Sequence, residues 1–245
     1  MITAILQARM SSSRLPGKVL APVLGQPMIG RQIERLQRSS RIDQLVVATS
    51  EDPSDDPLAT TIEMMGVPVV RGPLNDVLAR FITVLDVFPQ TQTVVRLTAD
   101  CPLCDWRLID AVIEALDASG ADYVNNTLVR TYPAGLDAEA VRATALRRTG
   151  TEAVSAYDRE HVTPYIYSVP GRFELSHIKR KSSLAEFRWT VDYPEDLDFV
   201  RHVYQSLYPA NPDFSSDDIL ALDWNSSRYQ AEPPATISQE SGSPL

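Results

Sequence analysis

The sequence predicts an α/β protein whose mostly parallel β-sheet carries helices on both faces. Short runs of aliphatic and β-branched residues, typical of buried parallel strands, alternate with longer segments whose apolar residues recur at helical spacing. Polar residues follow several of these runs directly, and open α/β sheets bind their ligands at the carboxyl ends of the strands. With 245 residues, the chain is long enough to build one such domain around a sizeable core.

Strands and helices are expected to alternate through the first half of the chain, as in a Rossmann-like fold. The apolar runs that predict strands are residues 2–6, 45–48, 67–70 and 94–98. Pro68 places the third of these at a sheet edge or a strand start, because proline cannot donate to a central ladder. Helices are predicted to begin at Pro27, Leu58 and Asn75, and Asp105 is expected to cap a further one.

The first predicted helix has a single apolar face. That face consists of Met28, Ile29, Ile33 and Leu36. Arg31, Arg35 and Arg38 lie off it, so we expect these three arginines to be solvated.

The alternation breaks down in the second half of the chain. Strands at residues 138–141 and 173–178 and a helix at 143–154 predict a small β-rich excursion near residues 125–180. A short strand is then expected to present Asp192. Pro194 should open a helix whose first turn holds Glu195 and Asp196, which complement the helix dipole.

Composition and charge restrict the class of protein. The 23 Lys and Arg against 32 Asp and Glu give a net charge of −9, which argues against general nucleic-acid binding. No stretch approaches the roughly 20 apolar residues of a membrane span. The chain begins directly with a strand and has two cysteines, so we expect no signal peptide and no disulfide framework, and hence a cytoplasmic protein. From about residue 228, prolines and serines replace apolar residues, which predicts a domain over 1–227 and a disordered tail over 228–245.

The loop after the first strand is the most informative stretch of the sequence. Arg9, Arg14 and Lys18 occur within ten residues. The small residues between them are Ser11, Ser12, Ser13 and Gly17. Small residues let backbone N–H groups converge on an anion, and three cations around such a loop suit a polyphosphate. An ordinary strand-to-helix connection with exposed charges is the alternative, since neither a Walker A motif nor G-x-G-x-x-G is present.

Polar residues at two other strand ends are further candidates. Thr49 and Ser50 follow the second strand and are either nucleotide contacts or a helix-capping cluster. Asp100 follows the fourth strand, where a carboxylate suits Mg²⁺, which binds one or two carboxylates together with substrate phosphates. The alternative is that Asp100 only forms a turn before Pro102.

Two residue pairs admit a chemical and a structural interpretation. Cys101 and Cys104 have a redox or zinc spacing, but there is no second such pair and there are only three histidines, so we interpret them as small residues of a pocket wall. Glu160 and His161 could perform acid–base chemistry, although the residues alone favour a structural charge pair at a helix start.

Short blocks in a fixed order carry a family resemblance. After the loop at residues 9–18, they are RGPLNDVLAR at 71–80, ADCPL at 99–103, YPAGLDAE at 132–139, REHVTP at 159–164 and VDYPEDL at 191–197. This series resembles the sugar cytidylyltransferases, which include the CMP-KDO and CMP-sialic acid synthetases. It is most similar to their spore-coat polysaccharide branch. The resemblance implies a Rossmann-like nucleotidyltransferase fold that transfers CMP from CTP to a sugar and releases pyrophosphate.

The resemblance also implies roles for the charged residues of the blocks. Arg9 and Arg14 would bind the triphosphate and the leaving pyrophosphate, and Lys18 would neutralise charge on the α-phosphoryl oxygens. Asp192 would join Asp100 as the second Mg²⁺ ligand, whereas Glu195 and Asp196 would remain helix-start charges.

Other implied positions surround the nucleotide and the sugar. Arg71, Asp76 and Arg80 would edge the nucleotide pocket, although Asp76 and Arg80 alone would be an i, i+4 helix pair. Backbone groups beside Ala8, with residues around Thr49 and Arg71, would recognise the base. The sugar side would include Tyr132, Asp137 and Glu139, and the excursion at 125–180 would cover it. Glu160 and His161 would then lie in the sugar pocket or at a homodimer contact.

Departures from the family pattern leave the substrate open. Ala99 replaces a glycine, which would tighten the backbone near the phosphates. The S-G-T-E-R block of the KDO synthetases is absent, so another sugar acid, such as a nonulosonate for a surface polysaccharide, is expected. One alternative is a nucleotidyltransferase of the same fold that acts on a sugar phosphate, polyol phosphate or phosphonate. Another is a nucleotide-sugar-binding or glycosyltransferase-type protein, although Asp100-Cys101-Pro102 is not the D-x-D that such enzymes often carry.

Overall fold

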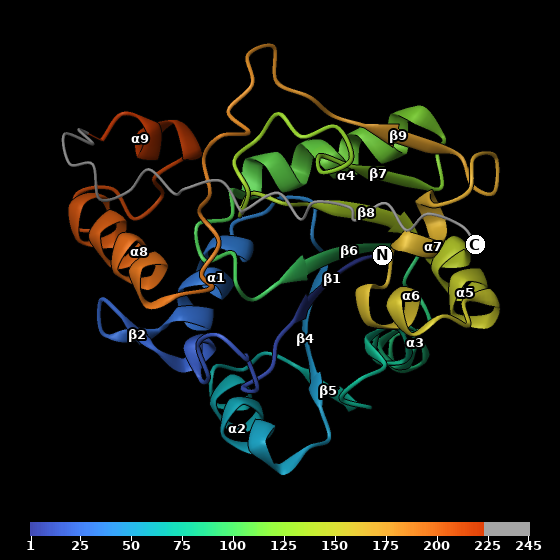
Figure 1. Cartoon of the computed structure of the whole chain (residues 1–245), viewed down its shortest axis with the longest axis horizontal. Coiled ribbons are helices and arrows are strands. Elements are labelled where there is room, and N and C mark those ends of the chain that lie inside the picture. The colour runs from blue at the N-terminus through green and yellow to red at the C-terminus, as the bar shows by residue number, and fades with distance from the viewer. Residues whose placement is uncertain (223–245) are drawn as a thin grey trace, which may run out of the picture.

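A seven-stranded sheet forms the centre of the computed structural model, which describes residues 1–222 (Figure 1). The predicted tail at 228–245 lies outside the described residues. Across the sheet the strands follow the order β5 (Val69–Gly72), β4 (Gln44–Ser50), β1 (Ile2–Gln7), β6 (Thr93–Thr98), β8 (Glu139–Arg142), β7 (Tyr123–Asn125) and β9 (Leu175–His177).

Neighbouring strands are parallel except around β8. β1 pairs in parallel with both β4 and β6, β5 with β4, and β9 with β7. β8 lies antiparallel between β6 and β7. The mostly parallel sheet is thereby confirmed, and β5 lies at the edge, as Pro68 predicted.

The order of the strands creates a topological switch point beside β1. The chain passes from β1 outward to β4 and β5, and then returns to the other side of β1 to form β6. The connections that leave β1 and β6 therefore diverge, and a crevice opens beyond the carboxyl ends of these two strands. In open α/β sheets this crevice is where ligands bind.

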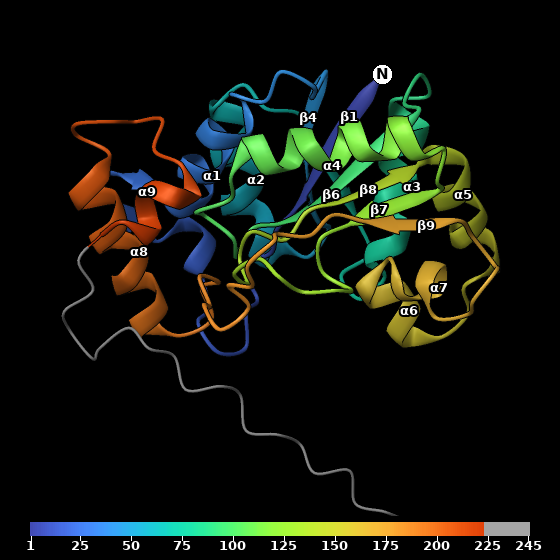
Figure 2. The same cartoon turned by 90° about the horizontal axis from the view of Figure 1, so that it is seen from above.

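Helices cover both faces because side chains alternate along the strands. Ala4 and Leu6 of β1 pack against α1 (Met28–Leu36), α2 (Asp56–Met64) and α4 (Trp106–Ser119). Ile5 points to the other face, where α3 (Val77–Val87), α5 (Ala143–Glu152) and α7 (Pro164–Tyr167) lie, with α6 (Ala156–His161) beside them. Figures 1 and 2 show these two groups of helices on opposite sides of the sheet.

The last two helices form a third layer outside α1. α8 (Pro194–Leu207) and α9 (Ser216–Leu220) pack on a separate apolar cluster that includes Trp189, Tyr204 and Phe214. Figure 2 shows them at one end of the molecule. Tyr204 Oη donates to the Pro102 carbonyl at 2.9 Å, which ties this layer to the loop after β6.

Two expectations about solvation and strand content are wrong. Arg31 and Arg35 are only 6% and 1% exposed, because the α8–α9 layer covers them and backbone carbonyls accept from their guanidinium groups. Residues 125–180 hold two short strands, which join the main sheet, and three helices, so this segment is more helical than β-rich.

The segment before α8 also differs from the expected strand. Asp192 follows an extended stretch that makes only an isolated bridge, between Ala134 and Arg188. Asp196 does act at the helix start: its carboxylate accepts from the backbone N–H groups of Asp192 and Tyr193 at 2.8 and 2.9 Å.

Short elements complete the described part of the chain. They are the 3₁₀ turns η1 (Lys18–Leu20) and η2 (Pro53–Asp55) and the small hairpin of β2 (Pro22–Val23) and β3 (Gln26–Pro27). Among residues 1–222, none of the helices has the length and apolar character needed to cross a membrane.

Candidate active site

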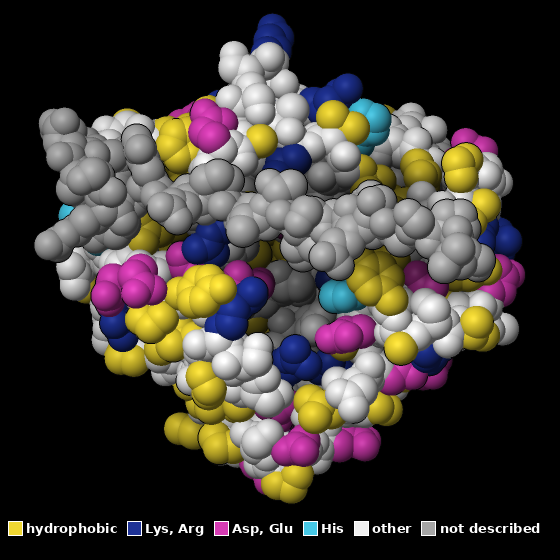
Figure 3. Space-filling model, viewed as in Figure 1, with side chains coloured by type: hydrophobic (Ala, Val, Ile, Leu, Met, Phe, Trp, Pro, Cys, Tyr) yellow, Lys and Arg dark blue, Asp and Glu magenta, His cyan; other side chains and the backbone are white. Residues whose placement is uncertain are grey.

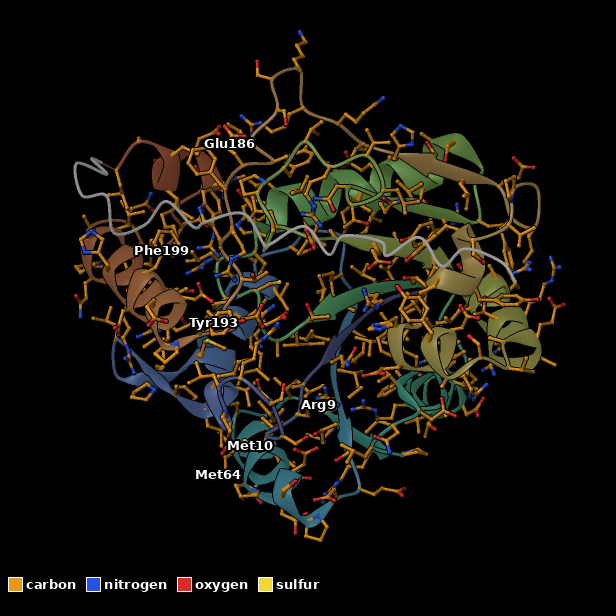
Figure 4. The ribbon with its side chains drawn as sticks, viewed as in Figure 1. Arg9, Met10, Met64, Glu186, Tyr193 and Phe199 are labelled. Atoms are coloured by element: carbon orange, nitrogen blue, oxygen red, sulfur yellow. The ribbon has the colours of Figure 1, made fainter. Side chains whose placement is uncertain are left out.

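A pocket of about 200 Å³ opens at the switch point between β1 and β6. Its lining consists of Gln7, Ala8, Arg9, Ser12, Ser13, Arg14, Lys18, Val19, Thr98, Ala99, Asp100 and Asp192. Figure 3 shows a hollow on this face with Lys and Arg side chains around it, and Figure 4 places Arg9 near the centre of the face. The structure thus brings the basic loop, Asp100 and Asp192 into one pocket, whereas Ser11 lies outside its lining.

The basic loop doubles back on itself after β1. The N–H groups of Ser12 and Gly17 both donate to the Met10 carbonyl, each at 2.9 Å. Gly17 has φ +74°, a left-handed conformation that a residue with a side chain rarely adopts. This turn lets Lys18 begin η1 with its side chain directed back into the pocket.

A buried carboxylate that the sequence did not single out anchors this loop. Asp55 accepts from the Met10 N–H at 2.6 Å and from the Ser50 N–H at 3.1 Å, and the Ser50 hydroxyl also donates to it. Ser50 is therefore a structural partner of Asp55 at the end of β4. Nothing in the local pattern reveals this role, because Asp55 lies 45 residues from Met10.

Asp100 and Asp192 are neighbours despite their distance along the chain. The Val191 N–H donates to the Asp100 carbonyl oxygen at 2.8 Å, so the two aspartates lie on adjacent backbones at the edge of the pocket. Gly135 permits this arrangement: a Cβ there would lie 2.7 Å from the Trp189 carbonyl carbon. The YPAGLDAE block therefore supports the backbone that presents Asp192.

Three cations surround the Asp192 carboxylate. Arg14 Nη2 and Lys18 Nζ lie 2.6 and 3.2 Å from its Oδ1, and Arg188 Nη1 lies 3.7 Å from its Oδ2. Burial alone would raise the pKa of Asp192, but the Lys18 and Arg14 charges hold it below its ordinary value. Lys18 Nζ also donates to the Val191 carbonyl at 2.5 Å, which fixes the ammonium group in the pocket.

The two aspartates fit a hard divalent cation that also binds phosphate. They supply carboxylate oxygens, which Mg²⁺ prefers, and one or two carboxylates are the usual number when phosphates provide further ligands. Within the described residues no group of three or more His, Cys, Asp or Glu is placed to hold a metal alone. The donor set therefore suits a metal that arrives with a nucleotide.

The residues assigned to the nucleotide edge lie on the β4–β5 side, outside the pocket lining. Arg71 donates to the Ser50 carbonyl at 2.7 Å, and Asp76 caps α3 and pairs with Arg159 at 2.7 Å rather than with Arg80. Thr49 is fully buried, and its hydroxyl oxygen has no partner among the described residues.

Arg80 is a fully buried cation on the same side. Within residues 1–222, its Nε and Nη1 have no hydrogen-bond partner. Burial, with the nearby charge of Arg9, lowers the pKa of Arg80 to about 10. Because an unpaired buried charge is costly, Arg80 is a candidate donor to a ligand.

Two of the residues assigned to the sugar side are held in ion pairs. Asp137 pairs with both terminal nitrogens of Arg130, at 2.7 and 3.0 Å. Glu139 is buried on β8, where it pairs with Arg96 of β6 and accepts from the Tyr123 hydroxyl at 2.5 Å. Tyr132 is partly buried near Arg180.

The Glu139 pairing leads to a stability prediction. We expect Glu139→Gln to destabilise the fold by about 3–5 kcal/mol, because it leaves the Arg96 charge unpaired. For a domain of this size, that lowers the melting temperature by more than about 6 °C. Glu152→Gln is the matched control, because its pair with Arg148 is exposed to solvent and contributes little to stability. Equal melting temperatures for the two variants would contradict the prediction.

Glu160 and His161 occupy the exposed end of α6. A charge pair at a helix start is therefore wrong, because the helix ends at His161 rather than beginning there. The ring centroids of His161 and Tyr157 lie 4.4 Å apart.

The two cysteines are free and buried. Burial raises the pKa of Cys104 to about 12 and that of Cys101 well above its ordinary value, so both are protonated thiols at neutral pH. They do not form a redox or metal pair, because reactive cysteines need a thiolate.

Sequence reasoning missed several residues of the site. Gln7 and Thr98 line the pocket as the last residues of β1 and β6, a position at strand ends that could have identified them. No pattern in the sequence identified Arg188, which lies beside Asp192.

The fold and the pocket together indicate the class of protein to which the chain belongs. A switch-point crevice with a cationic loop on one side and two carboxylates on the other has the charges to hold a nucleoside triphosphate together with a divalent cation, as a nucleotidyltransferase would need. Residues 3–210 match the family model described as cytidylyltransferase. The chain therefore belongs to the cytidylyltransferase family, as the blocks predicted.

Individual relatives cover nearly the whole chain. The spore coat polysaccharide biosynthesis protein SpsF of Bacillus subtilis is 32% identical over 228 residues, which cover 90% of this chain and 93% of that protein. A 3-deoxy-manno-octulosonate cytidylyltransferase of Anaeromyxobacter is 27% identical over 239 residues, covering 82% and 95%. The solved structure of a cytidylyltransferase from Leptospira borgpetersenii is 28% identical, with a TM-score of 0.88 over 95% of this chain and 98% of that one.

Proposed function

We propose that the protein transfers CMP from CTP to a sugar, of the sugar-acid type that includes the nonulosonates, for the synthesis of a surface polysaccharide. The observation that carries the proposal is the pocket itself, where Lys18, Asp100 and Asp192 meet the basic loop in a chain of the cytidylyltransferase family. The name of the Bacillus subtilis relative supports a role in polysaccharide synthesis. The relative that acts on an octulosonate supports a sugar acid, although this chain lacks the S-G-T-E-R block.

The reaction is an in-line displacement at the α-phosphorus. The acceptor hydroxyl oxygen forms a bond to that phosphorus as the bond to the β-phosphate oxygen breaks, and the hydroxyl proton passes to solvent. Arg9 and Arg14 bind the triphosphate and neutralise the leaving pyrophosphate. Lys18 is held rigidly by Val191 and stabilises charge on the α-phosphoryl oxygens in the transition state.

Asp100 and Asp192 are the residues that would hold Mg²⁺. When bound, the metal would screen the triphosphate charge and polarise the attacking hydroxyl. Arg71 and Arg80, together with Ala8 and Thr49, would form the base and ribose side, and Asp76 and Ser50 would support it through their contacts with Arg159 and Asp55. Tyr132, Asp137, Glu139, Glu160 and His161 would line or support the sugar side.

We also propose that residues 1–227 act as one domain of a cytoplasmic homodimer.

The test is a product analysis with CTP, Mg²⁺ and a panel of acceptors. We expect pyrophosphate and a CMP-sugar when the panel includes the correct sugar acid, and ³¹P NMR would show one phosphorus in that product. A sugar phosphate or polyol phosphate acceptor would instead give a product with two coupled phosphorus signals. A phosphonate acceptor would be revealed by the signal of its phosphorus bonded to carbon. Either product would replace the sugar-acid assignment, and no pyrophosphate with any acceptor would contradict the proposal.

A further inference from the structure

The two carboxylates of the pocket differ in the number of cationic side chains that pair with them. Asp192 is paired with Arg14, Lys18 and Arg188, whereas Asp100 has no ion pair within residues 1–222. Among residues 1–222, the Asp100 carboxylate accepts a hydrogen bond only from the Cys101 thiol, at 3.4 Å. A divalent cation that enters alone would therefore find one available carboxylate and one already engaged by cations.

The cations at Asp192 differ in how firmly they are held. Lys18 is 10% exposed and is fixed by the Val191 carbonyl, so its ammonium cannot leave without losing that hydrogen bond. The Arg14 side chain is 51% exposed, and besides Asp192 its guanidinium has the Tyr193 ring as a neighbour, with the ring centroid 5.4 Å away. Arg14 is therefore the cation that can move.

Arg9 provides a comparison within the same loop. It lines the same pocket and carries the same charge, but it forms no ion pair with a described carboxylate. Figure 4 shows Arg9 near the centre of the face and Tyr193 on the side of α8. Arg14 thus differs from Arg9 in the contact across the pocket to Asp192 and Tyr193.

We propose that the Arg14 guanidinium exchanges Asp192 for the triphosphate as its partner when the nucleotide binds, and we call this exchange the latch. Without a nucleotide, the guanidinium pairs with Asp192 Oδ1. The triphosphate then draws the guanidinium onto its own oxygens and removes one of the three cations from Asp192, which favours the binding of a divalent cation between Asp192 and Asp100. This inference rests on the proposed function, and it adds that the protein itself couples nucleotide and metal binding. By linkage, each ligand then strengthens the binding of the other.

The latch predicts that removing Arg14 improves metal binding in the absence of nucleotide. A partly exposed ion pair of this kind corresponds to about a fivefold change in affinity, or about 1 kcal/mol. Loss of a nearby positive charge also raises metal affinity through space, so the comparison must hold the charge change constant. Arg9→Gln does so, because it removes one arginine from the same loop.

The experiment is a titration of the nucleotide-free protein with Mn²⁺, with free metal measured by electron paramagnetic resonance. We expect Arg14→Gln to bind Mn²⁺ about fivefold more tightly than Arg9→Gln, and we expect Asp192→Asn to abolish that difference when it is added to both variants. Equal Mn²⁺ affinities of Arg14→Gln and Arg9→Gln would overturn the latch. A difference that persists with Asp192→Asn would also overturn it, because the effect would not pass through that carboxylate.

Failure of the latch is distinguishable from failure of the proposed function. The Mn²⁺ comparison uses no nucleotide and no turnover, so it tests the Arg14–Asp192 contact alone. The proposed function instead fails if the unmodified protein makes no pyrophosphate from CTP with any acceptor. Whichever result the Mn²⁺ titration gives, the assay of pyrophosphate release from CTP still decides the proposed function.

Discussion

Replacing Asp192 by asparagine is expected to reduce turnover by at least about 100-fold while the fold persists. The substitution removes the carboxylate that faces Arg14, Lys18 and the proposed metal position, and an amide cannot replace its charge. We expect the same loss for Asp100→Asn, because both side chains line the pocket. Initial rates of pyrophosphate release in Mg²⁺, with circular dichroism to confirm folding, would measure the effect.

A matched control separates charge at the site from charge in general. Asp198 lies on α8, six residues beyond Asp192, and its exposed carboxylate pairs with Arg201 of the same helix. Asp198→Asn should therefore leave turnover within about twofold, since exposed pairs contribute about 0.2–1 kcal/mol to stability and this one is remote from the pocket. Near-normal rates for Asp192→Asn would remove that residue from the metal position.

The second large effect is expected for Lys18→Ala. We predict a fall in kcat of about 10²–10³-fold with little change in KM for CTP, because Lys18 would stabilise charge that develops in the transition state. The rigid position of its ammonium group, fixed by Val191 and Asp192, is the reason for assigning it this role rather than a binding role.

Steady-state kinetics over a range of CTP concentrations would separate the two roles of Lys18. The exposed Lys181 offers a control in which one lysine is removed far along the chain from the pocket loop, and Lys181→Ala should leave both constants unchanged. If Lys18→Ala raises KM and leaves kcat unaltered, Lys18 is a uniform binding contact and not a transition-state group.

The sequence could predict the features that depend on neighbouring residues. Hydrophobic runs located the strands β1, β4 and β6 to within about two residues, and Asp105 caps α4 as its position indicated. The end of β6 then directed attention to Asp100, because parallel strands share one ligand-binding edge. These inferences need only local pattern and the general rule for α/β sheets.

Features set by distant contacts could not be predicted in this way. Arg35 was expected to be solvated because the residues of α1 alone do not show that the α8–α9 layer covers it. Asp55 became an anchor only through contact with Met10. The pairing of Arg96 with Glu139 depends on the antiparallel register of β6 and β8, which one sequence does not specify.

The most direct test of the central claim is thermal melting of the protein in Mg²⁺ with CTP, UTP, ATP and GTP in turn. A nucleotide at about 100 times its Kd should stabilise the fold by about 2.7 kcal/mol. For a chain of this length, each kcal/mol raises the melting temperature by about 2–4 °C. We predict a shift that is largest with CTP and greater with Mg²⁺ than without it. A larger shift with another nucleotide, or no shift with any of the four, would contradict a CTP-dependent enzyme.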